Sequence, residues 1–288
     1  MRFSKMHGLG NDYICVDCFR QTIELTSQET KELCDRHYGI GADGLILVRP
    51  SACADFKMEI YNADGSLAKM CGNGLRCAAR FAYEKDLCRK TRQTVETASG
   101  RRRAELFLEN GTVGQIRADM GVPCYNAHSI PVLCERDTVV NEPIQVRGEE
   151  YRMTAVSMGN PHAVIFTGEP EQIPLDRIGP LLEFHPRFPE RVNVEFCKVE
   201  DRNTLRVRVW ERGAGETLAC GTGACAVLVA AVLNEQAEEK ARIRLPGGIL
   251  EAEWNRAENH VYLTGSAEKV FEGIWERKRN NKISEKKG

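Results

Sequence analysis

The sequence predicts an α+β fold made of two duplicated, pseudo-symmetric halves, in each of which antiparallel strands wrap around a central helix. This prediction rests on motifs that recur at one fixed separation, and on an order of strands, glycine-rich turn and helix that both halves share. The length of 288 residues is compatible with two domains of ordinary size. We expect the functional site to lie in the cleft between the halves.

Three separate segments recur with a common offset of 149 residues: Gly10-Asn11 as Gly159-Asn160, residues 56–61 as 205–210, and Cys71-Gly72-Asn73-Gly74 as Cys220-Gly221-Thr222-Gly223. A single short match arises easily by chance, whereas three matches that keep one register indicate an internal duplication. The same register places Tyr13 opposite His162 and Asn62 opposite Glu211, so the surroundings of the two cysteine motifs differ.

Each Cys-Gly-X-Gly motif is followed by a predicted helix. After the first motif, apolar residues recur at helical spacing between residues 75 and 82. After the second, residues 224–233 are apolar on all sides, which is typical of a buried helix. Asn73 and Thr222 are good N-cap residues, so we expect the helices to begin there. Alternating or β-rich runs predict strands at residues 45–48, 56–61, 154–157, 163–167 and 205–210.

The register and the order of elements predict where the halves divide. We place the first half at residues 1–121 and the second at residues 122–265. Residues 276–288 are mostly polar and rich in lysine, so we expect a disordered basic tail there.

Composition and charge exclude several classes of protein. The formal net charge is −1, so the chain lacks the positive field of a protein that acts mainly on nucleic acid or an anionic membrane. The longest apolar run, residues 224–233, is far shorter than the roughly 20 residues of a membrane-spanning helix, and the N-terminus has no apolar signal segment. We therefore expect a cytoplasmic protein whose 12 cysteines remain free thiols.

Two motifs match known patterns without their usual context. Residues 39–44 fit the dinucleotide fingerprint G-x-G-x-x-G, but they precede an apolar strand instead of opening a helix, so we interpret them as a turn. Cys15 and Cys18 form a C-x-x-C pair, yet no second pair stands at zinc-binding spacing. We expect neither a nucleotide site nor a metal site from these residues.

Cys71 and Cys220 differ from the other cysteines because each combines repeat symmetry with flanking glycines and a helix start. The positive end of a helix dipole favours the thiolate, and backbone N–H groups beside glycine can bind a carboxylate. Two facing thiols therefore suit the inversion of an α-carbon. One thiolate would remove the α-proton while the other thiol supplies a proton from the opposite face. The remaining cysteines are expected to pack as small hydrophobic residues.

Longer motifs are spread over almost the whole chain: residues 7–13 (HGLGNDY), 61–66 (YNADGS), 70–77 (MCGNGLRC), 159–162 (GNPH), 191–196 (RVNVEF), and 210–217 (WERGAGET) running into 219–223 (ACGTG). In these motifs and in their order, the sequence resembles the diaminopimelate epimerase family. Because the motifs are numerous and ordered, the resemblance is specific.

The resemblance implies a cofactor-independent interconversion of L,L- and meso-diaminopimelate, a step in the synthesis of lysine and peptidoglycan precursors. It implies Cys71 and Cys220 as the acid/base thiols, with His162 and Glu211 modulating their pKa values. It also implies a homodimer without metal, and a strand near residues 266–275 that returns to the first half. The implied substrate contacts are Gly72, Asn73, Gly221 and Thr222 at the α-carboxylate, together with Asn11, Asn62, Asn160, Asn193, Glu211 and Arg212.

Two other functions remain compatible with the sequence. One is another two-base isomerase of the same fold, such as a proline racemase-like enzyme. Glu211 and Arg212 disfavour it, because a monocarboxylate substrate does not need recognition of a distal carboxylate and ammonium. The other is a cytosolic thiol redox or metal-binding protein, in which reversible switching of Cys71 and Cys220 would itself be the function.

Overall fold

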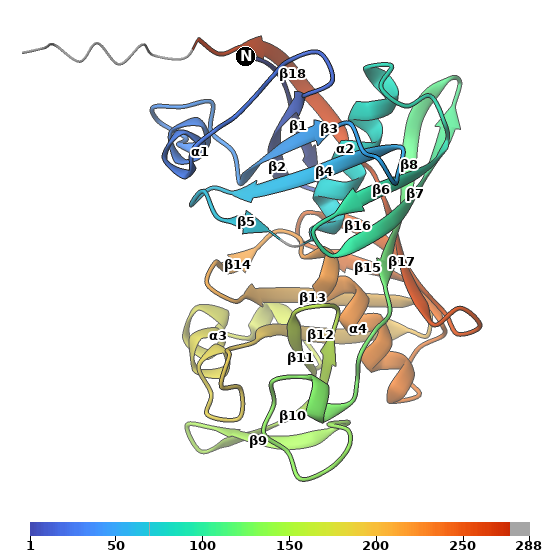
Figure 1. Ribbon diagram of the computed structural model, residues 1–288. Coiled ribbons are helices and arrows are strands. Elements are labelled where there is room, and N and C mark those ends of the chain that lie inside the picture. Colours follow the sequence, from blue (N-terminus) through green and yellow to red (C-terminus); the bar gives the residue numbers. More distant parts are fainter. Residues whose placement is uncertain (69, 277–288) are drawn as a thin grey trace, which may run out of the picture.

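The structure of the protein is a computed structural model that describes residues 1–68 and 70–276 (Figure 1). Its first half contains β1 (Arg2–Gly8), β2 (Asn11–Asp17), α1 (Ser27–Cys34), β3 (Gly44–Arg49), β4 (Phe56–Asn62), β5 (Leu67–Ala68), α2 (Gly72–Glu84), β6 (Arg92–Thr97), β7 (Gly100–Glu109) and β8 (Thr112–Gly121). The predicted strands at 45–48 and 56–61 are therefore confirmed.

The second half repeats this order, with short 3-10 helices at Ala127–Ser129 and Pro170–Gln172. Its other elements are β9 (Glu142–Val146), β10 (Glu149–Ser157), β11 (Pro161–Phe166), α3 (Leu175–Glu183), β12 (Asn193–Asp201), β13 (Thr204–Glu211), β14 (Gly215–Thr217), α4 (Gly221–Leu233), β15 (Lys240–Leu245), β16 (Gly248–Asn255) and β17 (His260–Gly265). The last strand, β18 (Glu268–Ile274), follows the second half. The α+β class predicted from the sequence is confirmed.

Strand pairing repeats with the offset seen in the sequence. Tyr13 pairs with Gly44 between β2 and β3, and His162 pairs with Asn193 between β11 and β12, at positions 149 residues apart. The same holds for the β3–β4 and β12–β13 pairs, where Leu45 lies opposite Tyr61 and Val194 opposite Trp210. The two halves are thus built on one pattern, which supports the duplication read from the sequence.

The sheet is mixed, whereas the sequence was expected to form antiparallel strands. Within the described residues, the pairs β2–β3, β4–β6, β11–β12 and β13–β15 are parallel. Crossover segments separate the partners of each pair, as parallel pairing requires. Alternation of apolar and polar residues identifies a strand but not the direction of its partner, so this feature was not predicted.

Each central helix begins directly after its cysteine. Cys71 and Cys220 are the N-cap residues, because their sulfur atoms accept the N–H groups of Gly74 at 3.5 Å and Gly223 at 3.4 Å. The expectation that Asn73 and Thr222 cap the helices is therefore wrong, because both lie inside the first turn. Their side chains are consequently free to make contacts outside the helix.

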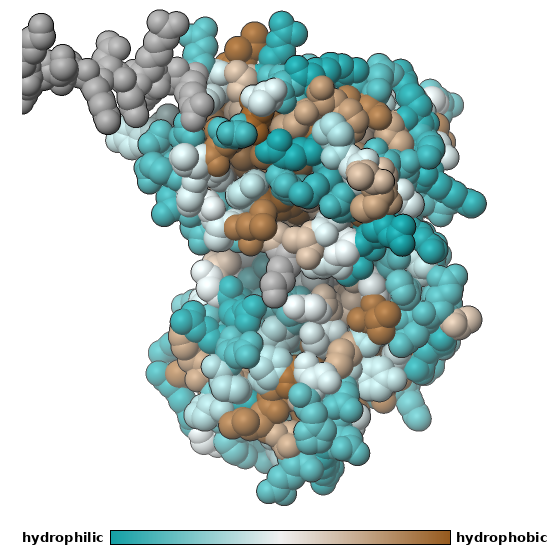
Figure 2. All heavy atoms as spheres, viewed as in Figure 1, coloured by the Kyte–Doolittle hydropathy of each residue, from teal (hydrophilic) through white to brown (hydrophobic). Residues whose placement is uncertain are grey.

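The two helices share one core and bring their first turns together. The largest core cluster contains buried residues of both α2 and α4, and α4 is buried around almost its whole circumference. A Cβ atom built on Gly221 would lie only 3.7 Å from Cα of Gly72. Glycine at these positions lets the two helix N-termini approach closely. The surface of the molecule narrows to a waist between its two halves (Figure 2).

Two strand pairings connect the halves through the end of the chain. β17 pairs with β8, and β18 pairs with β1, so the chain returns to the first half after β17. The division after residue 121 remains a prediction. The predicted disordered tail at residues 276–288 lies outside the described residues, apart from Glu276. Across residues 1–68 and 70–276, none of the helices has the length and apolar character needed to cross a membrane.

Candidate active site

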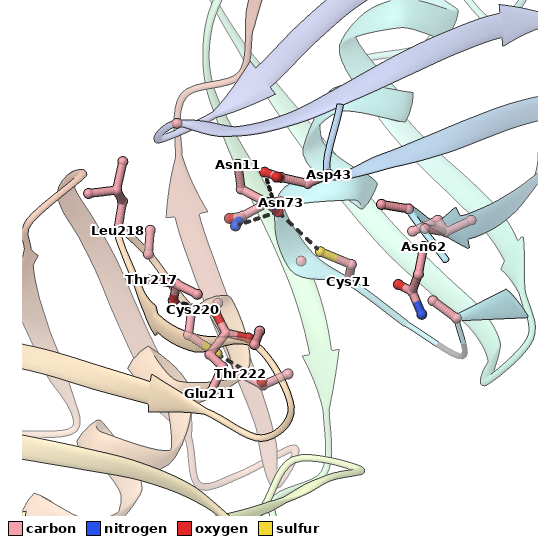
Figure 3. Close-up of a pocket in the computed structure, with 18 of the residues that line it drawn as sticks. Asn11, Asp43, Asn62, Cys71, Asn73, Glu211, Thr217, Leu218, Cys220 and Thr222 are labelled. Carbon is pink, nitrogen blue, oxygen red and sulfur yellow. Dashed lines mark hydrogen bonds between the residues drawn. The ribbon is translucent and has the colours of Figure 1, made fainter. Parts of the chain in front are cut away.

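A cavity of about 940 Å³ opens between the halves, within the size range of small-molecule sites. Cys71 and Cys220 lie on opposite sides of it (Figure 3). Of the residues predicted to form the site, these line the cavity: Asn11, Asn62, Cys71, Gly72, Asn73, Asn160, Glu211, Arg212, Cys220, Gly221 and Thr222. His162 and Asn193 are instead buried behind the lining.

The Cys71 side of the cavity consists of hydrogen-bonding groups. The hydroxyl of Tyr13 lies 2.9 Å from Sγ of Cys71, and the N–H of Gly74 points at the same sulfur. Oδ1 of Asn11 is 3.8 Å from the sulfur and accepts a hydrogen bond from Nδ2 of Asn73 at 3.2 Å. Cys71 is partly exposed to the cavity, so its sulfur is accessible to a ligand.

The side chain of Asn73 is held in place by the buried guanidinium group of Arg76. Arg76 is fully buried and donates from one guanidinium nitrogen to Oδ1 of Asn73 at 2.7 Å. Its Nε donates to the carbonyl of Ser266 at 3.2 Å. The arginine therefore fixes the amide of Asn73 in the first turn of α2 and adds positive charge to this helix end.

The Cys220 side of the cavity is buried and acidic. Cys220 is only 5 % exposed, and its sulfur contacts Oγ1 of Thr222 at 3.5 Å. Burial raises the pKa of the Cys220 thiol well above its usual range, and the carboxylates of Glu211 and Glu195 raise it further. In this state Cys220 is therefore the protonated thiol, which suits the role of proton donor.

Glu211 ends β13 and faces the cavity near Cys220. Its Oε1 accepts a hydrogen bond from the hydroxyl of Thr217 at 2.5 Å. Burial raises the pKa of Glu211, while the hydrogen bond from Thr217 acts in the opposite direction. A cationic ligand group beside this carboxylate would favour its charged form.

His162 and Glu195 form a buried pair behind the second half of the site. Nδ1 of His162 lies 2.7 Å from Oε1 of Glu195, and both side chains are inaccessible to solvent. Nε2 of His162 lies 3.1 Å from Oδ1 of Asn160, whose Nδ2 donates to Oγ1 of Thr222 at 3.3 Å. A continuous chain of hydrogen bonds therefore joins the buried pair to the first turn of α4.

The remaining predicted residues lie at the rim or support it. Arg212 is exposed, its guanidinium donates to the carbonyl of Glu190 at 2.9 Å, and its backbone N–H donates to Oδ1 of Asn193 at 3.0 Å. Asn193 thus supports the loop that carries Arg212. Asn62 ends β4 on the other side of the cavity, where its Nδ2 donates to Oγ of Ser66 at 2.9 Å.

Sequence reasoning did not select some residues that the structure brings to the site: Tyr13, Asp43, Glu195 and Thr217. The 149-residue register pairs Tyr13 with His162, and this signal could have identified Tyr13. The register gives no such signal for Glu195, because its partner in the first half is Ile46. Its polar side chain is brought below the Cys220 turn only by the tertiary structure.

Several other cysteines are buried away from the cavity. Burial raises the pKa of Cys77 to about 12 and also raises the pKa values of Cys15, Cys197 and Cys225. These thiols stay protonated and pack as hydrophobic groups, as expected from the sequence. Among the described residues, no group of three or more histidine, cysteine or acidic side chains is arranged to hold a metal ion.

Solved structures share the fold of this chain. A hydroxyproline epimerase from Agrobacterium vitis superimposes with a TM-score of 0.69 at 16% sequence identity, covering 95% of this chain and 91% of its own. A phenazine biosynthesis protein from Bacillus anthracis gives 0.64 at 14% identity, covering 95% and 98%. The family model for diaminopimelate epimerase matches residues 3–125 and 154–270, and the chain belongs to this family of isomerases.

Curated relatives support the same assignment at high identity. A diaminopimelate epimerase from Acetivibrio thermocellus is 53% identical over 273 residues, which cover 95% of this chain and 98% of the relative. One from Methanococcus maripaludis is 52% identical over 273 residues, covering 95% and 99%. The resemblance stated from the motifs is therefore confirmed over nearly the full length.

Proposed function

We propose that this protein interconverts L,L- and meso-diaminopimelate, with Cys71 and Cys220 as the two acid/base groups and no cofactor. The observation that carries the proposal is the pair of Cys-Gly-X-Gly turns, which cap two helices on opposite sides of one cavity. Membership of the family supports diaminopimelate as the substrate, and this geometry supports a reaction that uses two thiols.

The α-carboxylate of the substrate would lie between the first turns of α2 and α4. There the N–H groups of Gly72, Asn73, Gly221 and Thr222 and the positive ends of both helix dipoles favour an anion. The α-carbon then lies between the two sulfur atoms. A thiolate removes the α-proton, the electron pair of the broken C–H bond spreads onto the carboxylate, and the other thiol protonates the opposite face. One sulfur gains a proton and the other loses one, so charge is conserved.

The distal end of diaminopimelate carries a second carboxylate and a second ammonium group. The exposed guanidinium of Arg212 suits bidentate binding of a carboxylate, and the carboxylate of Glu211 suits an ammonium. Asn11, Asn62, Asn160 and Asn193 offer amides that can donate or accept. In this proposal His162 and Glu211 tune the thiols, since Glu211 acts directly on the pKa of Cys220.

Solvent deuterium incorporation tests the function. The enzyme in deuterium oxide should place deuterium at the α-carbon of L,L- or meso-diaminopimelate while epimerising it, and it should leave proline unchanged. The selectivity is expected because a monocarboxylate cannot engage Arg212 and Glu211 together. Turnover of proline with no turnover of diaminopimelate would instead establish the proline racemase-like alternative.

The redox alternative makes a different prediction. A disulfide between Cys71 and Cys220 would inactivate an epimerase, so a reducing agent should restore epimerisation after oxidation. Activity that is indifferent to the redox state of both thiols would contradict the two-thiol mechanism. Because catalysis requires both cysteines to be reduced, we place the protein in the cytoplasm, where thiols remain free.

We further propose that the enzyme is a homodimer that associates through β18. Three large apolar side chains of this strand are exposed: Val270, Phe271 and Ile274. An exposed apolar strand of this kind favours association with another protein surface. Light scattering should give the mass of two chains, and Phe271→Lys should shift the protein towards the monomer. A wild-type protein that is monomeric at micromolar concentration would contradict the proposal.

A further inference from the structure

Tyr13 is placed to act on one of the reacting sulfur atoms. It lies on β2, is 4 % exposed, and has its hydroxyl 2.9 Å from Sγ of Cys71. The same hydroxyl is hydrogen-bonded to Oδ1 of Asn11. The phenol therefore stands between the sulfur and an amide oxygen, and it also forms part of the cavity lining.

The hydroxyl has one proton and two neighbours that can accept it. Burial raises the pKa of Tyr13 well above its usual range, and the nearby Cys71 raises it further, so the phenol keeps its proton at neutral pH. Asn11 cannot offer a donor here, because its Nδ2 is already bound to Oδ2 of Asp43 at 2.9 Å. Its Oδ1 therefore faces Tyr13, and the phenol proton is shared between this oxygen and the sulfur.

The charge on the two sulfurs decides which neighbour accepts the hydrogen bond from the phenol. A two-base mechanism requires one thiolate and one thiol. Cys220 is the thiol in the ligand-free state, because burial and the carboxylates of Glu211 and Glu195 raise its pKa. With Cys220 as the thiol, the two-thiol mechanism needs Cys71 as its base, and in that role the phenol and the N–H of Gly74 can both donate to the sulfur of Cys71.

We propose that Tyr13 is a catalytic residue that donates its hydroxyl proton in a hydrogen bond to the Cys71 thiolate, and turns to Asn11 once the sulfur has taken the substrate proton. The inference rests on the two-thiol function proposed above. The phenol proton is never transferred; only the direction of the O–H bond changes. Tyr13 thus stabilises the base before reaction and releases it afterwards without gaining or losing charge.

The repeat shows how the two half-sites differ. Tyr13 occupies the position equivalent to His162, and Asn11 that of Asn160, and each aromatic side chain contacts its asparagine. In the second half the ring leads to the buried carboxylate of Glu195, whereas Ile46 is the equivalent residue in the first. On the Cys71 side, the neighbouring group is therefore the neutral hydroxyl of Tyr13, which can rotate. On the Cys220 side, the equivalent groups are the ionisable side chains of His162 and Glu195.

Tyr13→Phe removes only the hydroxyl and tests the proposal. At mildly acidic pH, where alkylation follows the fraction of thiolate, the rate of Cys71 modification by iodoacetamide relative to Cys220 should fall about five- to tenfold. This is the loss of one hydrogen bond to a charged group, partly offset by the greater nucleophilicity of the remaining thiolate. The value of kcat should fall by a similar factor with little change in KM. Tyr151→Phe, which loses an exposed hydroxyl bound to Glu149, is the matched control and should change neither quantity.

A second variant tests the proposal even if Tyr13→Phe does not fold correctly. A fluorotyrosine at position 13 keeps the ring and the hydroxyl but makes the hydroxyl a stronger donor, so it should raise the relative alkylation of Cys71 at the same pH. An unchanged Cys71-to-Cys220 ratio in both variants would overturn the role of Tyr13. Retention of activity by Cys71→Ser would instead overturn the two-thiol function itself, so the two failures are distinguishable.

Discussion

Replacement of Cys220 by serine is expected to lower kcat for epimerisation about 10²- to 10⁴-fold, the usual contribution of a positioned acid or base. A serine hydroxyl keeps its proton far more tightly than a thiol, so it can neither supply nor remove the α-proton at a useful rate. Binding should be largely preserved, because the N–H groups of Gly221 and Thr222 remain in place. Steady-state rates in both directions, with deuterium incorporation followed by mass spectrometry, measure the effect.

Cys71→Ser should cause a loss of the same size, with a different pattern of isotope exchange. Each surviving sulfur contacts one face of the α-carbon, so residual exchange should be confined to one stereoisomer, and to a different one in each variant. Cys53→Ser alters an exposed thiol outside the cavity and serves as the control, with no expected change in rate. Wild-type epimerisation by either Cys71→Ser or Cys220→Ser would show that the mechanism is wrong.

Removal of Glu195 is expected to cause the largest loss of stability among substitutions at the site. Glu195→Ala leaves Nδ1 of His162 buried without the partner that lies 2.7 Å away, and His162→Ala leaves the buried carboxylate of Glu195 without the same contact. Breaking a buried pair in this way typically costs about 3–5 kcal/mol. Urea unfolding, analysed at constant slope, gives the change in the free energy of unfolding for each variant.

The double variant decides whether the two groups act as a pair. If they do, Glu195→Ala combined with His162→Ala should cost clearly less than the sum of the two single losses. The exposed pair of Arg202 and Glu238, with N and O atoms 2.5 Å apart, is the matched control, and its loss should cost at most about 1 kcal/mol. Additive losses for His162 and Glu195, or losses as small as those of the control, would contradict the buried pair.

The internal duplication is what selected the candidate site in the sequence. Twelve cysteines alone identify nothing, whereas the shared register selected Cys71 and Cys220, which lie on opposite sides of one cavity in the structure. The same register also reproduces the strand pairing of β2 with β3 and of β11 with β12. Patterns that repeat within a chain therefore carried information about tertiary structure that composition and propensity did not.

Other features depend on contacts that no local pattern encodes. Asn73 and Thr222 were expected at the helix caps from residue preference, but sulfur atoms occupy those positions and release both side chains for other contacts. The parallel strand pairs depend on how crossover segments pack, which alternation does not reveal. Glu195 would be assigned to a polar strand position from sequence alone, and only the approach of α4 buries it below Gly223.

Because the two sulfur atoms cap α2 and α4, the reaction is linked to the stability of the first turn of each helix. A sulfur that gains a proton becomes a weaker acceptor for the amide it caps, while the sulfur that loses one becomes stronger. A charged group at a helix N-terminus contributes about 0.3–1 kcal/mol. In each turnover, the N-cap hydrogen bond of one helix, α2 or α4, therefore becomes stronger while that of the other becomes weaker. Since one end is always charged, this contribution to the free energy is similar before and after reaction, which suits a catalyst that must run equally well in both directions.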